Sequence, residues 1–333
     1  MQEESLLKSS SPRNKGLRKV SSTSTLCATP PKNDLLGLVI SEEVRYIRKG
    51  YGLISASVIA IAYFYFGPII CREWFWPLIL GMINKYQWEP WKFMVLFSTM
   101  WHACLVLLAN LGMWGIYHVE MPFFERYKIS TSPWPWKESK IEWRSLLTKS
   151  IALCLFNSIV SVPLLAILSL MMSCWEPQYS FDMADLPDTP KLMASVLFCM
   201  MCEDLTFHLT HRLLHWRVIY PYIHKVHHTY VTTVGIAAEY SHPIEFIFGA
   251  ALPGSVGGLI LGKHMHYCTM LLWVIVRVFE TLDGHCGYEF SWSPYRLLPF
   301  STSAEYHDYH HSHNFGNYSS FFSIWDTVFG QNH

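Results

Sequence analysis

The sequence predicts an all-α protein, a bundle of helices that crosses a membrane several times and carries a histidine-rich, two-metal cap on its cytosolic side. The bundle is predicted by composition: 51% of the 333 residues are hydrophobic and 15% are charged, against about 25% charged residues in a typical soluble domain. The cap is predicted by the histidines, because 14 of the 17 fall between His208 and His313. The net charge of zero gives no reason to expect nucleic acid as a partner.

Three parts follow one another along the chain. Residues 1–33 are polar, rich in Ser, Lys and Pro, and lack the apolar core of a signal peptide, so we expect a disordered N-terminal tail. Residues 34–189 contain the first transmembrane helices. Residues 190–333 contain the histidine clusters and a transmembrane hairpin.

Several apolar stretches are long enough, or nearly so, to cross a hydrocarbon layer, which takes about 20 helical residues. Four of them occupy residues 51–70, 93–117, 150–173 and 192–207. A further pair, 244–262 and 265–282, is separated by Gly262, Lys263 and His264, a break that predicts the tight turn of a hairpin.

The charges between these stretches predict the orientation. Lys and Arg are frequent in the N-terminal tail and in residues 119–149, and such residues accumulate on the cytosolic side of a membrane. Residues 174–190 contain acidic residues but no Lys or Arg, as expected of a non-cytosolic loop. Following the spans from a cytosolic N-terminus brings all the histidine clusters to the cytosolic face.

Three histidine clusters predict a centre with two metal ions. They are HLTHRLLH with His208, His211 and His215, HKVHH with His224, His227 and His228, and HDYHH with His307, His310 and His311. Spacings of three, four and seven residues place side chains on one face of a helix. Adjacent histidines diverge by about 100° on a helix, so each member of a pair can serve a different metal.

The residue types restrict the choice of metal. Structural zinc favours four ligands, commonly with cysteine thiolates, whereas these ligands are imidazoles and exceed four. Copper is compatible with imidazole, and iron is the best candidate because open positions on two imidazole-bound irons suit oxygen activation beside an apolar substrate.

Further polar residues lie close to the clusters in sequence. We expect His285, in DGHCGY, to be a metal ligand. Asp204, four residues before His208, can accept an imidazole N–H or can simply lie at the membrane interface. His242 and Glu245, in SHPIE, begin the hairpin and are expected to cap it or to support a ligand. For His313, ligation and a hydrogen bond to a neighbouring loop stay open.

These residues resemble the fatty acid hydroxylase superfamily, a group of membrane di-iron oxygenases that includes sterol C4-methyl oxidase, sterol C5-desaturase and fatty acid 2-hydroxylase. The resemblance is carried by HRLLH (211–215), HKVHH (224–228), HDYHH (307–311), AEYSHPIE (238–245) and WDTVFG (325–330). It covers roughly residues 190–333, and the intervening YSHPIE and GHCGYEF are most similar to the sterol methyl oxidase branch.

The resemblance implies that residues 190–333 form the catalytic region. It implies two irons held by His211, His215, His224, His227, His228, His307, His310 and His311, with His285 and His208 as additions. It also implies residence in the endoplasmic reticulum, electrons from NAD(P)H through cytochrome b5 or its reductase, and the use of O2 to oxidise an unactivated C–H bond of a lipid. The expected substrate is a C4-methyl sterol in an apolar tunnel.

Three other functions stay open at this point. A fatty-acyl or sphingolipid hydroxylase is the close variant of the sterol oxidase. A metal-handling membrane protein needs polar ligands along a transmembrane path, whereas these histidines gather on one side. A non-catalytic regulator or scaffold would keep the fold without using the metals.

Overall fold

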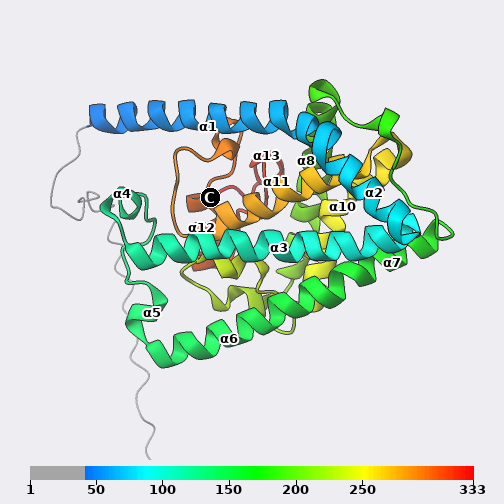
Figure 1. The fold of residues 1–333 in the computed structure, drawn as a ribbon. Helices are drawn as coiled ribbons and strands as arrows, with labels where there is room; N and C mark the ends of the chain where they lie inside the picture. The colour runs from blue at the N-terminus through cyan, green and yellow to red at the C-terminus, as the bar shows by residue number, and fades with distance from the viewer. Residues whose placement is uncertain (1–41) are drawn as a thin grey trace, which may run out of the picture. The chain divides into compact units, whose positions relative to one another are not determined.

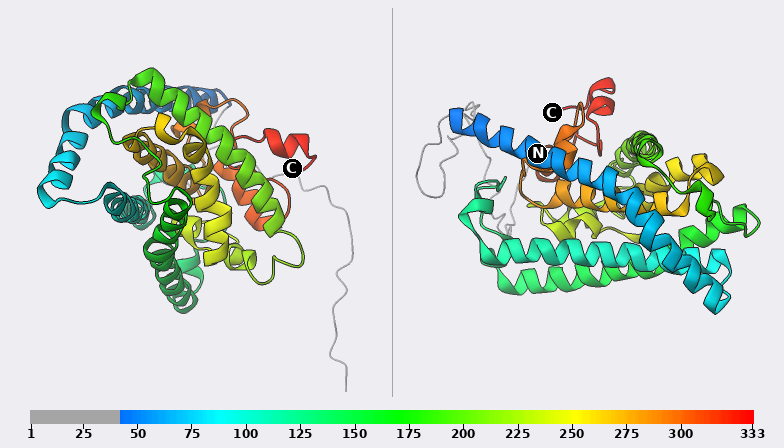
Figure 2. Two further views of the ribbon diagram at one scale, coloured as in Figure 1. Left: turned by 90° about the vertical axis from the view of Figure 1, so that its right-hand side faces the viewer. Right: turned by 45° about the horizontal axis from the view of Figure 1, so that its top comes forward.

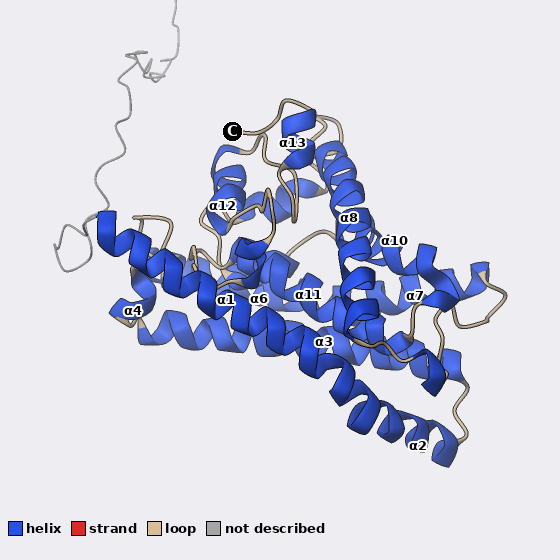
Figure 3. Ribbon diagram, turned by 90° about the horizontal axis from the view of Figure 1, so that it is seen from above, coloured by secondary structure: helices blue, strands red, loops and turns tan. Residues whose placement is uncertain are grey.

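The computed structural model describes residues 42–333. The expected tail, 1–33, and residues 34–41 lie outside the described residues. Over the described range the chain consists of helices and loops, with three isolated β-bridges and no strand (Figure 3). The prediction of an all-α fold is confirmed.

The α-helices form a bundle of long helices and a compact cap. In chain order they are α1 (Glu42–Ile70), α2 (Trp76–Tyr86), α3 (Pro90–Val119), α4 (Pro122–Glu125), α5 (Pro135–Glu138), α6 (Lys140–Phe156), α7 (Val162–Met172), α8 (Thr189–Leu214), α9 (Pro243–Glu245), α10 (Leu252–Leu261), α11 (Tyr267–His285), α12 (Ala304–His313) and α13 (Ile324–Val328). Short π-helical segments connect some of them: η1 (Cys71–Phe75), η2 (Asn157–Ser161) and η6 (Phe246–Ala251). The 3₁₀ helices are η3 (Met183–Asp185), η4 (His224–Thr229), η5 (Gly235–Glu239), η7 (Gly262–His264) and η8 (Pro294–Leu297).

Five helical stretches are long and apolar enough to cross a membrane. They are Lys49–Tyr86, Pro90–Val119, Lys140–Met172, Thr189–Leu214 and Pro243–His264. Many large apolar side chains on these stretches are exposed, as expected of surfaces that face lipid. Apart from residue 173, the four predicted spans and the first arm of the predicted hairpin all fall within them, so the multi-span character is confirmed.

The first of these stretches is longer than predicted. It contains 38 residues, or about 57 Å of helix, whereas the hydrocarbon layer is about 30 Å thick. Figure 1 shows α2 turning away from the direction of α1 at η1. The predicted span 51–70 is therefore only the first part of a bent helical unit.

The predicted hairpin is present, but its second arm is not a simple apolar span. The turn falls at η7, as predicted, and α11 follows it. Because α11 carries Arg277, Glu280 and Asp283, it is not among the candidate spans. Arg277 lies 2.6 Å from carboxylate oxygens of both Glu203 and Glu280. This helix is an internal one whose charges are paired, as burial requires.

Three connections meet at one end of the bundle: α2–α3, α7–α8 and the turn between α10 and α11 (Figure 1). The Trp91 and Trp175 rings lie 5.1 Å apart there, and the Ser180 N–H donates to the Met265 carbonyl over 3.0 Å. α3 and the continuous unit α6–η2–α7 run side by side (Figure 2). The C-terminal ends of α8 and α11 point away from this end and toward α12, so the histidines they carry converge.

Candidate metal centre

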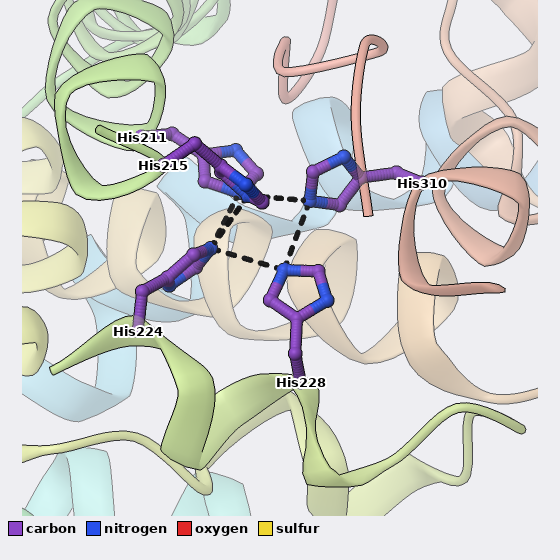
Figure 4. Close-up of side chains that lie close together, drawn as sticks. All are labelled: His211, His215, His224, His228 and His310. Carbon is purple, nitrogen blue, oxygen red and sulfur yellow. Dashed lines mark hydrogen bonds between the residues drawn. The ribbon is translucent and has the colours of Figure 1, made fainter. Parts of the chain in front are cut away.

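The structure brings histidine side chains together in two groups. The five-ring group contains His211, His215, His224, His228 and His310 (Figure 4). The four-ring group contains His227, His285, His307 and His311. Within each group, one nitrogen per ring lies within 4.8 Å of the others. The two groups adjoin, since the His228 and His311 ring centroids are 4.7 Å apart.

Adjacent histidines in the sequence are divided between the groups, as predicted. His227 and His228 on η4 belong to different groups, and so do His310 and His311 on α12. η4 and α12 therefore contribute to both groups, while α8 serves only the five-ring group and α11 only the four-ring group. Because the two shared elements bridge the groups, the centre is a single unit with two sites.

Backbone carbonyls fix the tautomer of several rings. The hydrogen bonds run from Nδ1 of His211 to Tyr318 O (2.9 Å), His310 to Gly316 O (2.6 Å), His311 to Tyr230 O (2.9 Å), His285 to Thr281 O (2.7 Å) and His227 to Tyr240 O (3.3 Å). A carbonyl oxygen can only accept, so Nδ1 of each of these rings carries the proton. In a neutral ring Nε2 is then left with an unshared lone pair.

The Nε2 atoms of the rings face one another. In the five-ring group, pairs of Nε2 atoms lie 2.9–3.2 Å apart, along the dashed lines of Figure 4. In the four-ring group, His285 Nε2 is 3.2 Å from His227 Nε2 and 3.0 Å from His307 Nε2. Lone pairs at this distance repel unless a cation lies between them. The donor set therefore fits one metal ion in each group.

Burial keeps these rings neutral. It lowers the pKa of His227 to about 4 and that of His215 to about 2, and neighbouring histidines lower the pKa of His215 further. Burial likewise lowers the pKa values of the remaining ligand candidates outside the membrane spans, namely His224, His228, His285, His307, His310 and His311. Neutral imidazole is the form that binds metal, so no proton has to leave at pH 7.

A carboxylate supports one ring of the five-ring group. Glu245, at the end of α9, is buried, and its Oε1 accepts a hydrogen bond from His224 Nδ1 over 2.7 Å. Such a pair fixes the ring orientation and makes the other ring nitrogen more basic. The structure thus places Glu245 where the sequence suggested a supporting role.

An apolar cavity of about 190 Å³ lies beside the centre. A site for one water needs roughly 10–15 Å³ on this scale, so the cavity is far larger than a packing defect. Its walls come from α3, α7, η6, α10 and α11 and include Trp101, Phe246 and Trp273. A smaller space of about 40 Å³ is lined by rings of both histidine groups. Ala238, Ala250, Arg277 and Thr281 line both spaces, so the cavity adjoins the space beside the histidines.

Comparison with known proteins identifies the family. The profile of the family described as fatty acid hydroxylase matches residues 196–331, a range that contains both histidine groups. Methylsterol monooxygenase 1 of Danio rerio is 33% identical over 257 residues, which are 76% of this chain and 81% of the relative. The chain belongs to the fatty acid hydroxylase family.

Two further relatives point to the same branch. Methylsterol monooxygenase 2-2 of Arabidopsis thaliana is 34% identical over 237 residues, 70% of this chain and 83% of the relative. Methylsterol monooxygenase 1 of Gallus gallus is 31% identical over 258 residues, 77% and 80% of the two chains. The predicted sterol methyl oxidase branch, and with it the class of oxidoreductase, is confirmed. No solved structure matches the chain significantly.

The structure does not bring His208 to either histidine group, so we leave it out of the proposed ligand set. It lies on the predicted face of α8 but seven residues before His215, or about 10 Å along the helix axis. Its Nδ1 is 3.3 Å from Ser319 Oγ and 3.5 Å from Asp326 Oδ1. The spacing of histidines on a helix predicts that they share a face, but not that they lie at the same position along the helix axis. For this reason the spacing included His208 among the ligands.

For Asp204, the sequence left open a hydrogen bond to an imidazole, but the described residues show none. Its Oδ1 accepts the backbone N–H groups of Ser320, Phe321 and Phe322 at 2.7–3.1 Å. The segment that precedes these residues supplies the Gly316 and Tyr318 carbonyls that hold two ligand rings. Asp204 therefore acts on the histidines through a loop.

Asp326 holds the same loop and was not singled out from the sequence. It accepts the backbone N–H groups of Tyr318 and Ser319 at 2.9 and 2.8 Å and the Tyr306 hydroxyl at 2.7 Å. Its presence in WDTVFG, a segment that contributes to the family resemblance, was the only available signal. The other two uncertain histidines lie outside the groups: His242 caps α9 by accepting from the Ile244 N–H, and His313 is exposed.

Proposed function

We propose that this chain is a di-iron oxygenase that uses O2 to oxidise the C4-methyl group of a sterol. The observation that carries the proposal is the pair of convergent groups of neutral imidazoles beside an apolar cavity. Family membership supports the reaction class, and the similarity to methylsterol monooxygenases supports a sterol as the substrate.

Iron is proposed on the basis of the donor set. Within the described residues the two groups contain imidazoles alone, five in one and four in the other. Structural zinc is typically held by four ligands in a closed tetrahedron, frequently with cysteine. When bound, two irons would supply the activation of dioxygen that attack on an unactivated C–H bond requires.

The residues of the chain perform the remaining tasks. The carbonyls of Gly316, Tyr318 and Thr281 hold ligand rings in one orientation, and Glu245 does the same for His224. The apolar and aromatic walls of the cavity exclude water and bind the lipid body, which orients one carbon toward the centre. Burial of the rings keeps them unprotonated.

The proposed electron source is NAD(P)H, acting through cytochrome b5 or its reductase, and the proposed location is the endoplasmic reticulum membrane with the histidines on the cytosolic side. The distribution of Lys and Arg supports this orientation. An N-glycosylation acceptor inserted near Asp182, between α7 and α8, should be glycosylated in microsomes. The same insert near Ser130, between α4 and α5, should not be. The reverse pattern would contradict the orientation.

Purified protein tests the function directly. We expect about two irons per chain and O2-dependent oxidation of a C4-methyl sterol in the presence of NADPH, cytochrome b5 and reductase. His211→Ala should abolish turnover, whereas a purely scaffolding protein would keep its cellular effect. Iron-loaded protein that oxidises ceramides or fatty acyl chains, but no sterol, would replace the proposed substrate with the fatty-acyl alternative.

A metal-handling function is less well supported. The histidines gather in two buried groups rather than along a path between two faces. Vesicle uptake assays distinguish this alternative, since metal flux that requires the histidines would favour it over the oxygenase.

A further inference from the structure

A polar pair interrupts the apolar wall of the cavity. His102 on α3 and Glu239 at the end of η5 both line it, and His102 Nε2 lies 3.8 Å from Glu239 Oε2. Glu239 is 8% exposed, and its Oε2 has no hydrogen-bond partner among the described residues. A buried carboxylate oxygen without a partner is costly, so this position points to a group that the protein alone does not provide.

The pair lies at the end of the cavity that meets the metal centre. Ala238, next to Glu239, lines both the cavity and the space beside the histidines. The carbonyl of Tyr240, on the other side, accepts from the ligand candidate His227. From Thr281 the cavity follows α11 to Met270, about 16 Å away along the helix.

Three other polar side chains of the cavity wall already have partners. Gln178 donates to the Ser169 carbonyl over 3.0 Å, and Ser98 shares a hydrogen bond of 2.7 Å with the Tyr267 hydroxyl. Arg277 is paired with Glu203 and Glu280. Unlike Gln178 at the far end of the cavity, Glu239 thus has a side-chain oxygen that forms no hydrogen bond.

We propose that His102 and Glu239 bind the hydroxyl group of the substrate and thereby choose which carbon faces the metal centre. The hydroxyl would donate to Glu239 Oε2 and accept from the His102 Nε2–H, while Ser158 Oγ, 3.2 Å from His102 Nδ1, donates to that nitrogen. An oxygen about 2.8 Å from each of two atoms fits this pair after a small adjustment.

This assignment deepens the proposed function and rests on it. In a C4-methyl sterol the carbon that bears the hydroxyl is bonded to the carbon that bears the methyl group. Holding the hydroxyl at the metal end therefore holds the methyl group there too, and the apolar body extends toward Met270. A fatty acyl chain has no hydroxyl next to the carbon to be oxidised and gains nothing from the pair.

The test compares the affinities of two sterols for the iron-loaded protein in lipid nanodiscs. One is a C4-methyl sterol and the other its 3-deoxy analogue, which lacks the hydroxyl. We expect the wild-type protein to prefer the hydroxyl sterol by about tenfold, as for a hydrogen bond to a charged group. Glu239→Leu should reduce the preference about tenfold, whereas Glu239→Gln, which retains an acceptor, should keep most of it. Comparing the ratio across variants cancels the different partitioning of the sterols into lipid.

Met270→Leu is the matched control, because it changes the apolar wall at the far end and should leave the preference intact. Iron content is measured for every variant. If Glu239→Leu loses iron, His102→Leu on α3 carries the test, with the same expected loss of preference.

Two kinds of result would overturn the inference and are distinguishable. In the first, the wild-type protein oxidises the sterol, but its preference for the hydroxyl sterol over the 3-deoxy analogue equals that of Glu239→Leu and His102→Leu. This result would exclude the role of the pair and leave the proposed function unchanged. Iron-loaded protein that neither binds nor oxidises any sterol would remove both.

Discussion

The two histidine groups use one residue type in two different environments. The five-ring group includes His215, which is only half-buried and stacks on Tyr220, and it has a carboxylate on His224. The four-ring group is fully buried, and three of its rings donate to backbone carbonyls. More ligands and a charged support favour tight binding. We therefore expect the five-ring group to hold its metal more firmly and the four-ring group to offer more open positions.

The largest expected effect comes from removing one ring of the smaller group. His311→Ala leaves three imidazoles there and should lower the iron content from about two to about one per chain, with loss of turnover. The matched variant, His228→Ala, leaves four rings in the larger group and should lose less metal. Mass spectrometric metal analysis after identical dialysis measures the difference. If both variants lost the same amount of iron, the five-ring group would not bind its metal more tightly than the four-ring group.

Acid should weaken both groups together. Burial lowers the pKa of His227 to about 4 and that of His215 to about 2 in the folded chain, whereas an unfolded histidine titrates near 6.5. Below pH 6.5 the unfolded chain binds more protons than the folded chain. The free energy of unfolding therefore falls as the pH drops from about 6.5 toward 4, by up to about 1.4 kcal/mol per histidine for each pH unit.

Thermal unfolding and iron retention between pH 7.5 and 5 measure this effect. We expect both to decrease on acidification, and a saturating metal concentration should shift the loss to lower pH, because protons and metal compete for the same nitrogens. Stability that stays constant across this range would show that the rings are not held neutral.

A smaller and more selective effect is expected from Glu245→Gln. The amide keeps the shape of the side chain but removes the charge that supports His224, so the metal affinity of the five-ring group should fall about 10- to 100-fold. The four-ring group, which lacks this contact, should be unchanged. Titration with a chelator resolves the two metals. Equal weakening of both would indicate a general structural defect.

The smallest effect is expected from His208→Gln. This ring contacts Ser319 and belongs to neither group, so both metals should be retained with less than about a twofold change in affinity. The melting temperature should decrease by a few degrees, because a buried contact is lost. Loss of one metal in this variant would restore His208 to the ligand set.

Local chemistry allowed much of this protein to be predicted from its sequence. Helix length and apolar composition predicted the spans, and the histidine spacings predicted two metals and the division of His227 from His228 and of His310 from His311. These features depend on neighbours a few residues apart, whose relative directions the helix geometry determines. Glu245 was named as a candidate supporting residue from its place at the start of the hairpin, but its contact with His224, 21 residues away, comes from the tertiary structure.

Other features depended on contacts between distant segments. The depth of His208 along α8, the loop that Asp204 and Asp326 hold, and the meeting of His102 with Glu239 join residues that are far apart in the chain. Periodicity gives the face on which a side chain lies, but only packing decides how far along the helix its partner sits. The sequence by itself thus determined the ligand type and the helical framework, and the tertiary structure decided which rings share a metal and what supports them.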